Sequence, residues 1–129
     1  MQFAFDGGDQ NPYLPKNHTE NNVVYTGTHD NDTTVSWFNG LSACAQQNVR
    51  ESLGGVEEPM PWALVASTLD SPALLAIIPM QDLLELGATA RMNTPGTLSP
   101  DNWNWCFEWG QINEKLLERI RKTIQSSQR

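Results

Sequence analysis

Two short apolar runs constrain the fold of this 129-residue chain most strongly, because both have the composition of buried strands. Residues 23–25 (Val-Val-Tyr) are β-branched and aromatic, and residues 75–79 are apolar without alternation, which is typical of a strand covered on both faces. Helices are predicted at 41–53, which a Gly-Gly pair ends, and at 62–69, which follows a proline-rich entry. Strand, helices and strand in this order predict an α/β fold with parallel strands.

Four further segments complete the predicted order. Residues 1–5 alternate like a third short strand, residues 80–86 favour a short helical turn, residues 93–105 form a long loop, and residues 112–124 form an amphipathic helix packed on the rest. The chain then supplies two to three βα units within one domain, residues 1–129. A closed (β/α)₈ barrel needs roughly 250 residues, so this chain cannot close one by itself.

Composition excludes several functions. The formal net charge is −7, and 13 of the 15 acidic residues but only 3 of the 8 basic ones precede residue 111. No nucleic-acid partner is expected, because phosphate contacts need clustered lysine and arginine. No apolar run approaches membrane-spanning length, and no signal peptide is recognisable, so no membrane partner is expected either. Cys44 and Cys106, far apart, fit a reducing compartment and a cytoplasmic location, and the chain lacks the cysteine and histidine spacing of a metal site.

A polar stretch follows the first predicted strand. Residues 26–34 are Thr-Gly-Thr-His-Asp-Asn-Asp-Thr-Thr, and Asn31 or Asp32 is a suitable N-cap for a helix that begins there. In barrel enzymes the side chains at the C-terminal end of a parallel strand face the active site, which makes His29 and Asp30 candidate functional residues. Turns and helix caps need the same residue types, so composition leaves a purely structural loop open.

Three motifs in order carry a resemblance to a known family. They are Tyr-Thr-Gly-Thr-His-Asp-Asn-Asp-Thr-Thr at 25–34, Ile-Ile-Pro-Met-Gln-Asp-Leu-Leu at 77–84 and Ala-Arg-Met-Asn-Thr-Pro-Gly-Thr at 90–97. With them the chain resembles the 4-α-glucanotransferases, also called amylomaltases or disproportionating enzymes, from about residue 2 to the C-terminal helix. The family commonly continues with Asn-Trp-x-Trp-Arg. Here residues 102–105 match, but Cys106 stands in place of the arginine.

The resemblance implies a fold and a set of site residues. The fold would be the incomplete C-terminal part of a (β/α)₈ barrel, and Met1 a cut point within a longer barrel. Asp30 would be the transition-state stabiliser among three catalytic carboxylates, and His29 would hydrogen-bond sugar hydroxyls. Asn93 is a candidate sugar contact, although a Pro-Gly turn explains its loop equally well, and Asn31 and Asp32 would hold their own loop. Four tryptophans are candidate sugar platforms, although tryptophan is more often a core residue: Trp37, Trp103, Trp105 and Trp109.

The implied activity is transfer of an α-1,4-glucan segment between malto-oligosaccharides by a retaining mechanism, with no cofactor and no metal. No motif for the nucleophile or for the acid/base is found in this sequence, so the chain alone is expected to be inactive. The expected partners are malto-oligosaccharide or α-glucan, together with the missing N-terminal part of the barrel or a second copy of this chain. The location would be the cytoplasm, or a plastid in a plant. Two alternatives stay open: a non-catalytic glucan-binding module, and a structural piece completed by another chain.

Overall fold

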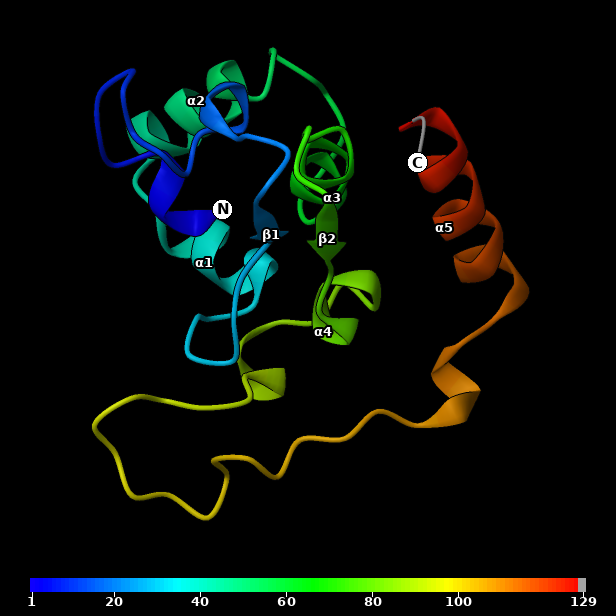
Figure 1. The fold of residues 1–129 in the computed structure, drawn as a ribbon. Helices are drawn as coiled ribbons and strands as arrows, with labels where there is room; N and C mark the ends of the chain where they lie inside the picture. The colour runs from blue at the N-terminus through cyan, green and yellow to red at the C-terminus, as the bar shows by residue number, and fades with distance from the viewer. Residues whose placement is uncertain (128–129) are drawn as a thin grey trace.

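A computed structural model describes residues 1–127, and its centre is a pair of parallel strands. β1 (Val23–Tyr25) pairs with β2 (Leu75–Ile77) in the register Val23↔Leu75 and Tyr25↔Ile77. Figure 1 shows the two arrows side by side and pointing the same way. Both strands were predicted from the sequence, and their parallel pairing confirms the predicted α/β organisation.

Three helices form the crossover between the strands: α1 (Thr34–Gly40), α2 (Ala43–Ser52) and α3 (Trp62–Leu69). The α1 N-cap is Thr33, whose hydroxyl accepts from the Ser36 N–H, so the prediction of Asn31 or Asp32 as cap was wrong by one to two residues. The helix α2 ends as predicted, because Gly54 has φ +85°, a conformation that glycine adopts without a Cβ penalty.

The predicted strand at residues 1–5 was wrong. Gln2–Ala4 is a short 3₁₀ helix (η1), in which the Ala4 N–H donates to the Met1 carbonyl at 2.8 Å. Met1 and Ala4, three positions apart, are buried, whereas Phe3 is 56% exposed. The apolar positions therefore follow the period of a 3₁₀ turn, and the segment packs beside α1 and α2 rather than extending the sheet (Figure 1).

The core lies between the strands and the crossover helices. Val24, Leu64 and Ala73 form its buried centre with Met1, and Trp62 is also almost fully buried. The other face of the sheet is open: exposed fractions there are 51% at Val23, 50% at Leu75, 36% at Tyr25 and 38% at Ile77. The prediction that the second strand is covered on both faces does not hold within this chain, because Leu75 and Ile77 keep 50% and 38% of their surface exposed.

Beyond β2 the chain forms the helix α4 (Met80–Leu83), which confirms the predicted helical turn, and the 3₁₀ turns η3 (Ala88–Ala90) and η4 (Trp109–Gln111). Between these turns it runs extended past one edge of the molecule, and it then rises into α5 (Glu114–Ser126) beside α3 (Figure 1). None of the helices described in residues 1–127 has both the length and the apolar character needed to cross a bilayer.

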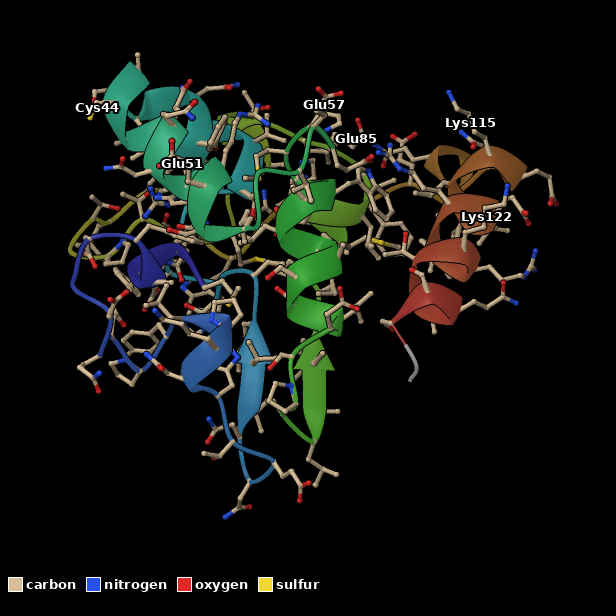
Figure 2. All side chains as sticks on the ribbon, turned by 90° about the horizontal axis from the view of Figure 1, so that it is seen from above. Cys44, Glu51, Glu57, Glu85, Lys115 and Lys122 are labelled. Atoms are coloured by element: carbon tan, nitrogen blue, oxygen red, sulfur yellow. The ribbon has the colours of Figure 1, made fainter. Side chains whose placement is uncertain are left out.

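A cluster around Arg119 attaches α5 to the rest of the chain. The Arg119 guanidinium lies 4.3 Å from the Trp62 ring centroid and bonds to Glu58 and, at 2.6 Å, to Glu85. Glu85 also accepts from the Trp62 indole N–H at 2.6 Å. In Figure 2 the Glu85 side chain lies between α3 and α5, near the first turn of α5, where Lys115 is labelled. The amphipathic helix is therefore packed on the rest of the chain, as predicted, and it contacts α3, although Leu117 on its apolar face is still 39% exposed.

Candidate functional site

Two loops meet at the edge of the sheet where both strands end. The first runs from Thr26 to Thr33 and joins β1 to α1, and the second, Ile78-Pro79, joins β2 to α4. Because β1 and β2 are paired in parallel, their carboxyl ends lie side by side. Residues about fifty positions apart in the sequence therefore become neighbours at this edge. This edge carries the predicted site residues.

A buried carboxylate in α4 fixes the start and the end of the first loop. Asp82 is 2% exposed; its Oδ2 accepts from the Thr26 hydroxyl at 2.5 Å and from the Thr34 hydroxyl at 2.8 Å. Its Oδ1 accepts from the Thr34 N–H at 2.9 Å, the first amide of α1. A buried carboxylate needs such donors to offset the loss of its hydration. The second motif, residues 77–84, contains this residue, but its role was not predicted.

The loop between these anchors is held mainly by its own side chains. Asn31 Oδ1 accepts from the Thr28 N–H at 2.8 Å and from its hydroxyl at 2.9 Å. Asp32 accepts from the Ser36 hydroxyl at 2.7 Å and from the Thr33 N–H at 2.8 Å. These contacts agree with the prediction that Asn31 and Asp32 hold the loop, and they leave His29 and Asp30 at its outer end.

Asp30 lies where the first loop meets a third segment, which follows η3 and contains Arg91 and Asn93. Its Oδ1 accepts from Asn93 Nδ2 at 2.6 Å and lies 3.4 Å from His29 Nε2. Arg91 joins the first loop to this segment, because it donates to the Asp30 carbonyl at 2.7 Å and to the Asn93 carbonyl at 2.8 Å. All three predicted site residues are thus brought together, and Arg91, part of the third motif but not singled out from the sequence, positions two of them.

The site is open to a polar ligand. The side chains of His29 and Asp30 are 54% and 50% exposed. Beside them lies a pocket of about 160 Å³ whose lining includes His29, Thr28, Gln81 and Arg91. A half-exposed carboxylate next to an imidazole and a guanidinium can bind hydroxyl groups, and it can stabilise a developing positive charge. Residues 1–127 hold no group of three histidine, cysteine or acidic side chains arranged to bind a metal.

The candidate tryptophans lie in different environments. Trp37 is half-buried and contacts Phe5 at a centroid distance of 5.8 Å, which is a packing role. Trp109 is 80% exposed and packs edge-on against Phe107. Trp103 lies beside a predicted site residue, since its ring centroid is 4.8 Å from that of His29.

Comparisons with known proteins agree on one family. The family model described as 4-alpha-glucanotransferase matches residues 1–111. The 4-alpha-glucanotransferase of Synechocystis sp. is 49% identical over 118 residues, which are 90% of this chain and 23% of that protein. The chloroplastic/amyloplastic 4-alpha-glucanotransferase of Arabidopsis thaliana is 48% identical over 107 residues, which are 81% of this chain and 18% of that protein. The 4-alpha-glucanotransferase of Thermus thermophilus is 41% identical over 137 aligned residues, which cover 100% of this chain and 27% of that protein.

A solved structure has the same fold. It is amylomaltase from Streptococcus agalactiae in complex with acarbose, which superposes with a TM-score of 0.89 at 27% identity over 99% of this chain and 26% of its own. The chain thus has an α/β fold like that of the matching part of this amylomaltase. It spans about a quarter of the length of the relatives that it matches, within their C-terminal portion. The chain belongs to the 4-alpha-glucanotransferase family.

Proposed function

We propose that residues 1–129 are the C-terminal part of a (β/α)₈ catalytic barrel and contribute two βα units and a closing helix. The open face of β1 and β2 supports this, because barrel strands have neighbours on both sides and side chains on both faces. The occupants of that face would be the preceding strands of the barrel. A second copy of this chain is the other partner that could cover it.

Asp30 is proposed as the transition-state stabiliser of an α-1,4-glucan transfer. A retaining transfer passes through an oxocarbenium-like state in which positive charge develops on the sugar ring. A carboxylate fixed before the reaction stabilises that charge without having to reorganise. The observation that carries the proposal is the fixed position of Asp30, which Asn93 and Arg91 hold from two sides while half of its side chain stays exposed.

His29 and Asn93 are proposed to bind sugar hydroxyls beside Asp30. The imidazole has a donor and an acceptor nitrogen, and it lies half-exposed at the outer end of the loop. The Asn93 amide already donates one hydrogen bond to Asp30, so it orients the carboxylate and keeps a second N–H for a ligand. The substrate class that fits these groups is malto-oligosaccharide or α-glucan.

The nucleophile and the acid/base must come from outside this chain. The two acidic residues that line the neighbouring pocket are committed elsewhere, because the buried Asp82 accepts three hydrogen bonds and Asp32 accepts from the Ser36 hydroxyl and the Thr33 N–H. One carboxylate cannot act as both nucleophile and proton donor in a retaining reaction. The isolated chain is therefore proposed to be inactive.

The test is reassembly of the enzyme from two pieces. This chain is co-expressed with the part of the Synechocystis relative that precedes the matching region, and the purified pair, called the assembled enzyme below, is assayed for glucose release from maltotriose. The expected result is release by the pair and by neither piece alone. Release by the chain alone would show that a carboxylate within it serves as nucleophile, and would overturn the proposal. Binding of maltoheptaose without release by the pair would favour the non-catalytic glucan-binding module.

The expected location stays a prediction. Among the relatives are bacterial proteins and proteins whose names assign them to chloroplasts or amyloplasts. We propose the cytoplasm or a plastid for this chain. Cys44 and Cys106 are both free and exposed, which suits a reducing compartment. Figure 2 shows Cys44 on α2, on the opposite side of the molecule from α5.

A further inference from the structure

Trp103 has a backbone conformation that a bulky residue rarely adopts. Its φ is +63°, and Trp103 and Glu85 are the two residues other than glycine with positive φ in residues 1–127. The left-handed region brings Cβ close to the backbone, so a tryptophan there costs conformational energy that surrounding contacts must offset. Glu85 has an evident structural role, because it bonds Trp62 and Arg119. Trp103 has no such role in the core.

Backbone and side-chain hydrogen bonds hold Trp103 in place. Its N–H donates to the Met92 carbonyl at 2.7 Å, which ties it to the residue immediately before Asn93. The neighbouring Asn102 accepts from the Thr94 N–H at 3.0 Å and donates to the Thr97 carbonyl at 3.1 Å. Residues 93–102 thus form a loop whose two ends are hydrogen-bonded to each other, and this places Trp103 beside the site.

The indole is presented beside the candidate site rather than buried. Trp103 remains 62% exposed although its ring lies 4.8 Å from His29 with the planes inclined at 42°. Contact with His29 occupies at most one face of the ring. Trp109 is more exposed still, so exposure does not distinguish Trp103. The strained backbone together with the contact to a site residue does, and this combination points to a ligand.

We propose that Trp103 is an aromatic platform on which one glucose ring of the glucan packs, next to the ring that contacts Asp30. A glucose ring has apolar C–H faces that pack on an indole and hydroxyls on its rim that need polar partners. Trp103 supplies the flat apolar surface, and His29, Asp30 and Asn93 lie beside it as the polar partners. This inference rests on the proposed function, because it assigns a further contact to the same substrate.

The test uses the assembled enzyme and the kinetics of glucose release from maltotriose. Packing of a glucose ring on Trp103 is made in the bound ground state as well as in the transition state, so its loss raises KM and leaves kcat nearly unchanged. For Trp103→Ala we expect KM to rise at least about 10-fold, and Trp103→Phe, which retains a smaller ring, should recover part of the loss. Trp109→Ala is the matched control, because Trp109 is more exposed and packs on Phe107 instead of a site residue.

The kinetic results distinguish a failure of the Trp103 platform from a failure of the proposed glucan transfer. An unchanged KM in Trp103→Ala, with transfer by the unaltered pair intact, would overturn the platform and leave the proposed function standing. A fall in kcat at constant KM would also overturn it, because that result would mean that the loop only positions Asp30. An equal rise in KM for Trp109→Ala would show a general loss of structure. No transfer by the unaltered pair would overturn the proposed function and the platform with it.

Discussion

Replacing the buried Asp82 by alanine should destabilise this chain more than any other single substitution considered below. The substitution leaves three donors without their acceptor, at the junction of β1, α1 and α4: the two hydroxyls of Thr26 and Thr34 and the Thr34 N–H. Hydrogen bonds to a charged acceptor contribute about 1.5–3 kcal/mol each, which would give roughly 4.5–9 kcal/mol for three.

Two effects reduce that sum. The hydroxyls can rotate toward other acceptors, and the variant no longer buries a charge, which itself costs free energy. A net loss of about 3–5 kcal/mol in the free energy of unfolding remains, which is a large share of the total of about 5–15 kcal/mol for a domain. Asp82→Asn keeps one acceptor oxygen and should lose less, about 1–2 kcal/mol.

The assay is urea unfolding followed by far-UV circular dichroism, with the free energy taken from the midpoint at constant slope. Asp101→Ala is the matched control, because Asp101 is exposed and its carboxylate accepts a single weak hydrogen bond, from the Ser99 hydroxyl at 3.3 Å. Its loss should stay within about 0.5 kcal/mol. An Asp82→Ala midpoint equal to that of the control would refute the reasoning that this carboxylate anchors the loop.

Three further results are expected. Arg119→Ala removes two ion pairs and the stacking on Trp62. In hydrogen–deuterium exchange followed by mass spectrometry, the amides of α5 should exchange about 10-fold faster while those of β1 and β2 stay protected. Equal acceleration in all these elements would contradict this prediction. Gly27→Ala would place a Cβ 3.1 Å from the side-chain amide nitrogen of Gln2. The melting temperature of this variant should fall, through a loss of about 1–3 kcal/mol in the free energy of unfolding. The melting temperature of Gly8→Ala, where the added Cβ meets open space, should stay the same. Burial lowers the pKa of His18 below its ordinary value of 6.5, so the unfolded chain binds more protons than the folded chain does. The melting temperature should therefore decrease as the pH falls from 6.5 through the folded-state pKa. His18→Gln should flatten the plot of melting temperature against pH in this range, and an unaltered slope would contradict the reasoning.

Local sequence signals predicted the parts of the fold that local chemistry determines. The helix at Trp62–Leu69 was predicted with its bounds because the prolines before it and Asp-Ser-Pro after it both interrupt helical structure. The end of α2 followed from Gly54-Gly55 in the same way. Residues 1–5 were misassigned because five residues fit a period of two and a period of three almost equally well, and packing against α1 and α2 decided between them.

The site shows the same division between local and distant interactions. His29, Asp30 and Asn93 came from motifs, and the roles given to them remain proposals. Their arrangement could not be predicted from spacing, because the hydrogen bond from Asn93 to Asp30 joins residues 63 positions apart. The anchor at Asp82 likewise acts on Thr26 over 56 positions, and nothing in the chain near either residue reveals it.

The role of Asp30 is tested most directly by two isosteric substitutions in the assembled enzyme. Asp30→Asn keeps the shape and the Asn93 contact but removes the charge that the oxocarbenium-like state requires, so kcat for glucose release should fall by at least about 10²–10³-fold. Asp32→Asn removes an equal charge two residues away, from a carboxylate that bonds Ser36, and kcat should stay within about 10-fold. Equal kcat values for the two variants would contradict the assignment of Asp30 as the catalytic carboxylate of this chain.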